Sequence, residues 1–313
     1  MRAALAALAL LGAGCEQYFD PCFATAQQVK DLRVLALRAD PPEAVFDPGG
    51  GGVPEVVVTA LVVDPAGDPD DVLAVARFCP STDDRRCPPD APAVGVIESV
   101  RGVFRFTVRA THAMLAAALD ADPLRGYGGI RLQVDLELAA SFGRRLSATK
   151  LLLYSPAAPG YVPNHGLEIV GLHLLRGGLP AGDAGPGTSL ELIAGEWLGI
   201  IPELAPGDGA SMPAEEFEVV DLSGKRARLR EHLSYSLYST PHGRFTADTA
   251  DQPPDGTTPS FAGLVRFMPT QQARGTFYVV VRDGRGAVAW LSLDWGAVEP
   301  NEGRQPNREL GCE

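Results

Sequence analysis

The tetrapeptide from Ser147 to Lys150 has the Ser-x-x-Lys spacing of a serine nucleophile activated by a lysine. That chemistry needs the serine at the start of a helix, because the lysine one turn later then reaches the hydroxyl. The motif runs into Leu151 to Tyr154, which we expect to be a strand, and in a strand the two side chains point to opposite faces. No Ser-Asp-Asn or Lys-Thr-Gly motif accompanies it. We therefore interpret the match as coincidental.

Clustered aspartates in the segment DPAGDPDD could supply hard oxygen ligands to a calcium ion: Asp64, Asp68, Asp70 and Asp71. Their spacing does not match an EF-hand loop, and Asp-Pro steps are ordinary turn chemistry. We favour the turn and keep calcium as the alternative. A second acidic loop is a weaker candidate of the same kind and contains Asp248, Asp251 and Asp255.

The five histidines form no recognisable zinc pattern, because none is paired at helical spacing or adjoins a cysteine or glutamate in a ligand motif. His173 lies in an apolar run, where we expect a packed or edge residue. The chain also lacks a Gly-x-Ser-x-Gly elbow, a phosphate-binding loop and a dinucleotide fingerprint. A glycosidase carboxylate pair would meet only in the fold. We predict no catalytic residues, no cofactor and no enzymatic activity.

Trp290 is the one candidate binding residue. It precedes Trp295 by five positions, so in one continuous strand the two side chains face opposite ways. If Trp295 faces the core, Trp290 faces outward and could stack on a sugar or anchor a protein contact. We favour the alternative, in which Trp290 is covered by a neighbouring loop or by the other domain.

The first 14 residues, MRAALAALALLGAG, have the layout of a signal peptide: one arginine, an apolar run and then small residues. The run is shorter than the about 20 apolar residues that cross a bilayer. Leu11 to Cys15 resembles the lipobox of bacterial lipoproteins, in which the cysteine is lipidated and becomes the new N-terminus. Gly12 stands where that motif usually has an aliphatic residue. The resemblance implies an acyl (palmitate) anchor on Cys15, and an ordinary secretory signal is the alternative.

Five cysteines are an odd number for an exported chain: Cys15, Cys22, Cys79, Cys87 and Cys312. Lipidation of Cys15 leaves four, which suffice for two disulfides in an oxidising compartment and allow three pairings. Cys79 and Cys87 flank a segment rich in proline and charge, so we expect a local bridge there. Cys22 with Cys312 then follows by elimination. A metal site is disfavoured because no Cys-x-x-Cys spacing occurs.

The composition favours a loop-rich β protein. The chain has 313 residues, a formal net charge of −12, 45% hydrophobic residues, 35 glycines and 27 prolines. This length suggests two domains, and the hydrophobic fraction argues against disorder. An acidic chain without a basic block is a poor ligand for nucleic acid or a bare anionic membrane.

Short runs with period-two alternation predict about a dozen strands, among them residues 32–39, 55–63, 103–109, 130–138, 146–154, 167–175 and 189–194. Thr111 to Leu119 predicts one short helix capped by Thr111. The strongest hairpin pattern joins Gly275–Arg282 to Ala287–Leu293 through an Asp-Gly turn. Together these patterns predict an all-β protein of two antiparallel immunoglobulin-like β-sandwich domains, with one short helix in the first.

The expected organisation is a signal peptide (1–14), a lipidated tether (15–28), a first sandwich (29–155), a linker (156–160), a second sandwich (161–299) and a C-terminal tail (300–313). The linker is the turn-rich stretch SPAAPG, and residues 177–187 and 195–213 are expected to be loops.

The hairpin sequence GTFYVVVRDGRGAVAWLSL resembles the last two strands of immunoglobulin-like and PKD-like modules in bacterial surface proteins. The stretches LRVLALRADPPE and VVVTALVVDPAG are similar to the first two strands of such modules in predicted lipoproteins of high-GC bacteria, notably myxobacteria. The antibody-type Cys…Trp…Cys spacing is absent, so only the architecture carries over. The resemblance implies modules that act as spacers, adhesins or partner-binding domains.

We therefore expect a membrane-anchored cell-envelope lipoprotein that acts as a non-catalytic structural, adhesive or partner-binding module. Its expected partners are the membrane, through the lipid, and an envelope protein or glycan; nucleic acid is not expected. Glu16 follows the lipidated cysteine, whereas inner-membrane retention is usually associated with aspartate there, so we expect the outer membrane of a Gram-negative bacterium.

Two alternatives stay open. One is an exported hydrolase of envelope polysaccharide or peptidoglycan, with a site built from loops such as Pro180 to Gly187 and Pro202 to Pro213. The other is an accessory subunit of an envelope machine.

Overall fold

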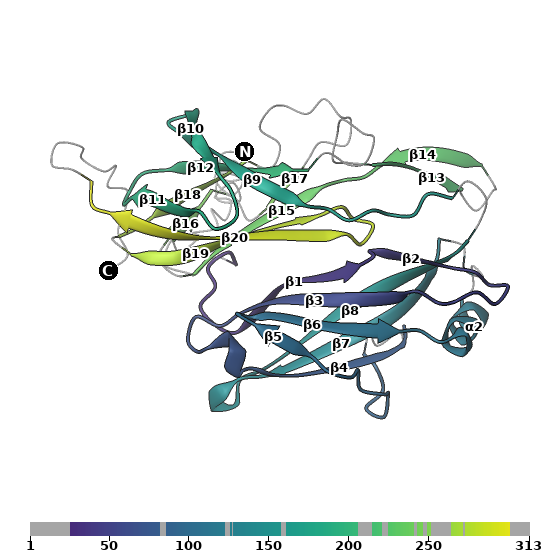
Figure 1. Cartoon of the computed structure of the whole chain (residues 1–313). Coiled ribbons are helices and arrows are strands. Elements are labelled where there is room, and N and C mark those ends of the chain that lie inside the picture. Colours follow the sequence, from purple (N-terminus) through teal and green to yellow (C-terminus); the bar gives the residue numbers. More distant parts are fainter. Residues whose placement is uncertain are drawn as a thin grey trace, which may run out of the picture.

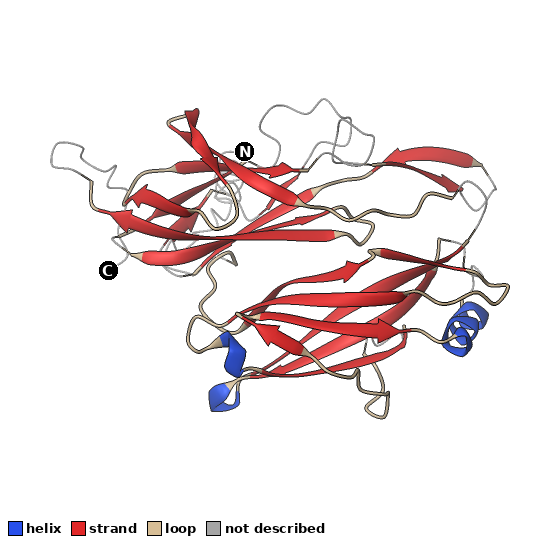
Figure 2. Ribbon diagram, in the orientation of Figure 1, coloured by secondary structure: helices blue, strands red, loops and turns tan. Residues whose placement is uncertain are grey.

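A computed structural model of the chain describes residues 26–81, 86–122, 126, 128–157, 161–205, 215–220, 225–240, 243–246, 249–251, 264–271 and 273–300. These residues form two β-sandwiches, drawn one above the other in Figure 1. Nearly all of their regular structure is strand, as Figure 2 shows, which confirms the all-β prediction. Cys15, Cys22 and Cys312 lie outside the described residues, so lipidation and the second disulfide stay predictions.

The first sandwich packs two four-stranded sheets, ordered β1-β3-β6-β5 and β2-β8-β7-β4. Its strands are β1 (Arg33–Asp40), β2 (Glu43–Phe46), β3 (Glu55–Val63), β4 (Leu73–Pro80), β5 (Glu98–Val100), β6 (Val103–Arg109), β7 (Ile130–Ala139) and β8 (Arg145–Pro156). Helix α2 (His112–Ala121) connects β6 to β7. It begins after the predicted cap, because the Thr111 hydroxyl accepts a hydrogen bond from the Met114 N–H at 3.1 Å.

The second sandwich packs two five-stranded sheets, ordered β10-β9-β12-β18-β16 and β11-β20-β19-β15-β17. Its strands are β9 (Ile169–Arg176), β10 (Leu179–Ala184), β11 (Ser189–Ile193), β12 (Leu198–Leu204), β15 (Ser234–Ser239), β16 (Gly243–Phe245), β17 (Thr249–Asp251), β18 (Val265–Pro269), β19 (Arg274–Arg282) and β20 (Val288–Val298). A separate hairpin pairs β13 (Glu216–Val220) with β14 (Arg226–Arg230).

Both sandwiches repeat one immunoglobulin-like strand order. In each, the first strand pairs with the next long strand, β1 with β3 and β9 with β12. A short strand then crosses to the other sheet and pairs in parallel with the last strand, β2 with β8 and β11 with β20. The other strand pairs of the two sandwiches are antiparallel, as predicted. In the first sandwich, Pro41 and Pro42 separate β1 from β2, because proline cannot continue the ladder.

Two segments expected to be loops are strands. β10 occupies most of the Gly- and Pro-rich stretch after β9, where Gly177 and Gly178 adopt positive φ values of 58° and 82° and form the turn. β12 lies inside the stretch expected to be irregular and joins the core. The Pro180 to Gly187 segment is therefore mostly an edge strand, which leaves less loop for a hydrolase site than the sequence suggested.

Alternation fills each core as the sequence predicts. In the first sandwich, Val56, Val58, Ala60 and Val62 of β3 all face inward and are buried. In the second, Phe267 packs edge-on against Phe277 at 4.5 Å and against Trp295 at 5.4 Å, measured between ring centroids. The Trp295 indole N–H donates to the Ser239 hydroxyl at 3.1 Å, so this buried polar atom is satisfied.

The predicted disulfide between Cys79 and Cys87 is present. Cys87 lies on the outer face of β7, where its backbone N–H donates to the Asp135 carboxylate. Gln133 and Thr149 donate to the other Asp135 oxygen at 2.8 and 3.0 Å. The bridge therefore holds Cys87 against polar residues of the sheet.

Replacing both Cys79 and Cys87 with alanine should lower the free energy of unfolding by about 2–3 kcal/mol, because the unfolded chain regains the entropy of the closed loop. Urea unfolding of wild type and variant gives this difference. A reducing agent should lower the wild-type midpoint by more than that of the variant, in which only the predicted Cys22–Cys312 bridge is left to reduce. Equal midpoints for oxidised wild type and variant would contradict this role for the bridge.

Candidate functional site

An apolar seam joins the two sandwiches. The first sandwich contributes Leu35 and Ala36 of β1 and Leu61 and Val63 of β3. The second sandwich contributes Val280 and Val288, and the segment before β1 contributes Val29. We call this surface the seam. At the seam the outer face of one sheet packs on the outer face of another, which holds the two sandwiches together.

Trp290 lies at the edge of the seam. As predicted from the alternation, Trp295 is buried in the core of its own sandwich, and Trp290 is on the opposite face of β20. There it packs against the seam cluster, and the Arg38 guanidinium of the first sandwich sits 4.8 Å from its ring centroid. The structure thus places Trp290 against the other sandwich, where its ring is already stacked.

A buried ionic cluster closes one end of the seam. Arg285, in the turn between β19 and β20, approaches carboxylates from both sandwiches. Its guanidinium lies 3.4 Å from Glu43, 3.0 Å from Glu231 and 3.5 Å from Glu215, and stacks on the Phe217 ring at 4.5 Å. The Glu43 and Glu231 side chains are each 1% exposed. We call Arg285, these three glutamates and Asp283 the Arg285 cluster.

The remaining oxygens of the cluster accept hydrogen bonds. Asp283 accepts from the backbone N–H groups of Arg285, Gly286 and Ala287 at 2.8, 2.8 and 3.0 Å, and from the Asn164 amide at 2.7 Å. Glu43 accepts from the Asn164 N–H at 2.7 Å and from the hydroxyls of Ser155 and Tyr161. The segment that links the sandwiches is thereby tied to both of them.

The cluster has more negative than positive charge. Four carboxylates face one guanidinium, and the nearby Lys150 ammonium donates to the Gly286 carbonyl at 2.7 Å. Burial lowers the pKa of Lys150. Burial also raises the pKa of Glu231 to about 7, and the charges of Asp283 and Glu215 act in the same direction, against the opposing effect of Arg285. A proton on Glu231 relieves the excess charge.

The first described residues of the chain clamp the seam from the other side. Gln28 forms a parallel bridge with Ser239, the Val29 N–H donates to the Ser239 carbonyl at 2.9 Å, and the Ser239 N–H donates to the Gln27 carbonyl at 3.0 Å. Gln27 and Val29 are 2% and 1% exposed. The segment just before β1 of the first sandwich is therefore bound to β15 of the second. We call the contact of residues 27–29 with Ser239 the N-terminal clamp.

The aspartates of the segment DPAGDPDD form contacts that stabilise loops of the first sandwich. Asp64 forms a bidentate pair with Arg144 at 2.6 and 2.8 Å, and Asp68 accepts from the Asp70 N–H at 2.9 Å. Asp70 accepts from the Gly102 N–H at 3.0 Å, which lowers its pKa, and Asp71 is exposed. In the described part of the chain, no three His, Cys, Asp or Glu side chains gather into a potential metal site. The geometry of Asp64, Asp68 and Asp70 is that of turns.

The other sequence motifs do not converge on a site. Ser147 and Lys150 both lie on β8 and point to opposite faces, with Lys150 in the seam. His173 lies on the outer face of β9 beside Asp183 at 2.6 Å and Glu203 at 3.7 Å. Asp248 and Asp255 lie outside the described residues.

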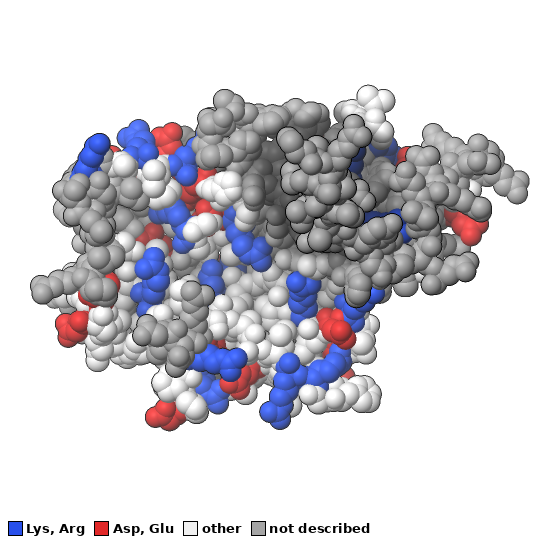
Figure 3. All heavy atoms as spheres, turned by 180° about the vertical axis from the view of Figure 1, so that it is seen from behind, with Lys and Arg blue, Asp and Glu red and all other residues white. Residues whose placement is uncertain are grey.

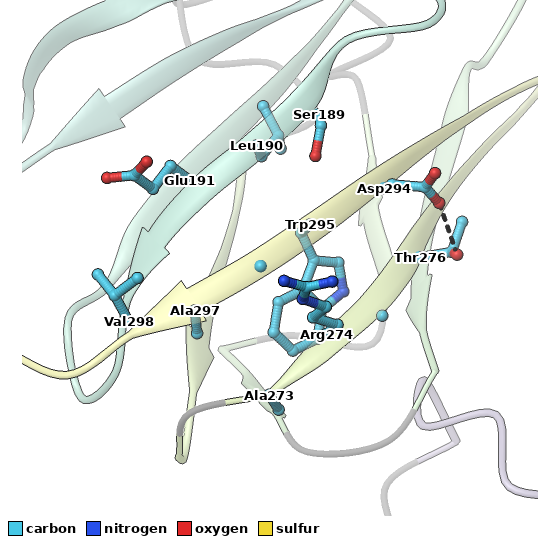
Figure 4. A pocket seen from close by; sticks show the side chains of 12 residues that line it. Ser189, Leu190, Glu191, Ala273, Arg274, Thr276, Asp294, Trp295, Ala297 and Val298 are labelled. Carbon is cyan, nitrogen blue, oxygen red and sulfur yellow. Dashed lines mark hydrogen bonds between the residues drawn. The ribbon is translucent and has the colours of Figure 1, made fainter.

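An open groove is present on the outer face of the second sandwich, at the far end of β20 from the seam. It has a volume of about 1070 Å³ and is lined by β11, β19 and β20 (Figure 4). Leu190, Trp295 and Ala297 are buried, so they contribute backbone to its floor. Its side chains come from the outward-facing residues Ser189, Glu191, Arg274, Thr276, Asp294 and Val298. We call it the β20 groove.

The sheet register places these side chains in rows. Asp294 lies between Ser189 and Thr276 in one row, and the Thr276 hydroxyl donates to its carboxylate at 3.0 Å. In the next row Gly296 lies between Glu191 and Arg274. Since Gly296 has no side chain, the middle of that row is open backbone. Sequence reasoning named none of these residues as a site, because β11 and β19 are far apart in the chain.

No family model matches the chain, and no curated protein matches it. Solved structures similar to it include the Yersinia pseudotuberculosis adhesin InvE, at 10% identity and a TM-score of 0.23, where the match covers 83% of this chain and 58% of that chain. The Clostridium thermocellum CbhA fibronectin(III)-like modules match at 9% identity over 88% of this chain and 100% of that chain, with a TM-score of 0.23. The N-terminal Ig1-2 module of the Drosophila receptor protein tyrosine phosphatase DLAR matches at 10% identity over 86% and 99%, with a TM-score of 0.24. TM-scores this low support no inference about ligand or activity.

The raised pKa of Glu231 makes stability depend on pH. Its folded pKa of about 7 lies above the ordinary value of 4.5, so its contribution is full below pH 4.5 and is lost as the pH rises through 7. Between pH 5 and pH 8 the free energy of unfolding should fall by about 2 kcal/mol through this group. Glu231→Gln should flatten that profile, as measured by urea unfolding at several pH values. Glu98→Gln, at an exposed position of β5, is the control and should keep the wild-type slope.

Proposed function

We propose that this chain is a lipid-anchored module of the bacterial cell envelope in which two immunoglobulin-like sandwiches act as one non-catalytic body that presents a binding surface. The observation that carries the proposal is the seam. Its apolar contacts, the Arg285 cluster and the N-terminal clamp join the sandwiches at three places. Two domains joined by a flexible linker would need none of these contacts, whereas two domains that hold a binding surface in a fixed direction need all of them.

The clamp connects this body to its proposed anchor. Gln27 and Gln28 are the last residues of the expected tether, and both are bound to the second sandwich. Lipid on Cys15 would therefore hold both sandwiches through the seam. A diacyl or triacyl anchor gives the stable attachment that a single chain would not. Among the described helices, none has the length and apolar character to span a bilayer.

The described carboxylates and histidines support a module without catalysis. The buried carboxylates of the Arg285 cluster are occupied by Arg285, Asn164 and backbone N–H groups. His165 and His173 each contact a carboxylate at 2.6 Å. In the described part of the chain, these side chains are therefore held in contacts within the fold.

Anchoring is tested by the intact mass and the membrane fraction of the protein from its native host. We expect a mass that lacks residues 1–14 and carries acyl chains, and recovery with the outer membrane. Cys15→Ser should release the protein into the soluble fraction, whereas Cys22→Ser should leave it in the membrane. A wild-type protein with an unmodified Cys15 would contradict the proposed lipid anchor.

The absence of catalysis is tested separately, with the purified mature chain on peptidoglycan and envelope polysaccharide. No products should form. Hydrolysis of either substrate that is lost on replacing one specific carboxylate would contradict the non-catalytic proposal and favour the hydrolase alternative.

A further inference from the structure

We propose that the β20 groove binds a neutral saccharide chain, so that the surface presented by the anchored module is a glycan-binding one. This inference rests on the proposed function and names its ligand class. The groove lies on the half of the β11-β20-β19 face that the first sandwich leaves uncovered (Figure 1).

The floor of the groove is open because of one glycine. A Cβ atom added to Gly296 would meet no atom nearer than the Arg274 Cγ, at 3.9 Å. Gly296 thus leaves free space above the backbone at a position where any other residue would place a side chain. Glycine in the interior of a strand often marks a close approach by another molecule.

The charges around the floor favour an uncharged polar ligand. The Glu191 and Asp294 carboxylates and the Arg274 guanidinium line one groove. An anionic ligand would face two carboxylates, and a cationic one would face Arg274. Sugar hydroxyls can donate to the carboxylates and accept from the guanidinium, so a neutral polyol satisfies both.

The lining also favours a saccharide over a protein segment. Val298 is the one apolar side chain among the outward-facing residues that line the groove. Protein partners are usually held by aromatic or aliphatic anchors in desolvated pockets, and the described lining offers none. On the described part of the face seen from behind in Figure 3, basic and acidic side chains are likewise interspersed among uncharged ones, so that part is not of one sign.

Binding at a single groove should be weak, because no aromatic ring points into it from the described residues. A dissociation constant in the millimolar range, about 1 mM, is expected for one trisaccharide. Many copies held on one membrane would then bind a long glycan through multivalency.

The test is titration of the full mature Cys15→Ser chain with trisaccharides, followed by calorimetry and saturation-transfer NMR. The neutral probes are maltotriose, cellotriose and triacetylchitotriose. Trigalacturonate is the anionic probe and the deacetylated chitotriose the cationic one. We expect at least one neutral probe to bind and to be preferred over both charged ones.

Gly296→Val should weaken that binding by at least about tenfold, because the branched side chain fills the floor of the groove. Ser292→Val places the same side chain on the same face of β20 outside the groove and should bind as wild type does. Arg274→Met removes the donors without adding bulk and should also weaken binding, which keeps the test valid if the glycine variant folds poorly.

Binding to no neutral probe, preference for a charged probe, or binding unchanged in both groove variants would each overturn the saccharide proposal. None of these outcomes bears on the anchor, which the mass and the membrane fraction report independently. A lipidated protein that binds no saccharide would remain an anchored module with a different ligand.

Discussion

The placement of one guanidinium between buried carboxylates determines how the two halves of this protein fit together. Arg285 meets Glu43 of the first sandwich and Glu231 of the second, and both glutamates are almost fully removed from water. Buried ions cost more to desolvate than their attraction readily returns, so such a cluster contributes little net stability. Its geometry is demanding, however, because a small rotation of one sandwich would leave a carboxylate without its partner. The apolar seam supplies adhesion, and the Arg285 cluster selects one arrangement among the many that apolar contact alone would allow.

One strand connects this constraint to the proposed binding surface. β20 runs for 11 residues, and its outward-facing side chains begin with Val288 and Trp290 in the seam and end with Asp294, Gly296 and Val298 in the β20 groove. Ser292, between them, is exposed. The same face of one sheet is therefore divided between an interface inside the chain and a surface open to other molecules. Because both lie on one continuous strand, the direction of the groove relative to the first sandwich is set by the way the two sandwiches are joined.

The fold was largely predictable from local pattern, and the sites were not. Period-two alternation identified β6, β7 and the β19–β20 hairpin, and Thr111 identified the start of α2, because these signals depend on neighbouring residues alone. β10 and β12 were missed because their glycines and prolines are turn signals in isolation, and only pairing with β9 makes them strands. The Arg285 cluster joins residues up to 242 positions apart. The sequence offered one faint signal, an arginine between two glycines in a tight turn, and no pattern could show which carboxylates would surround it.

The N-terminal clamp also determines when the structure can be completed. Gln28 and Val29 bind Ser239, so a segment that precedes β1 waits for more than two hundred later residues before it finds its partner. The first sandwich can assemble its own core from residues 33–156 before the second is complete, but with the outer faces of β1 and β3 still exposed. Closure of the seam requires both sandwiches. It buries the apolar surface that would otherwise make the half-folded protein prone to associate with its neighbours.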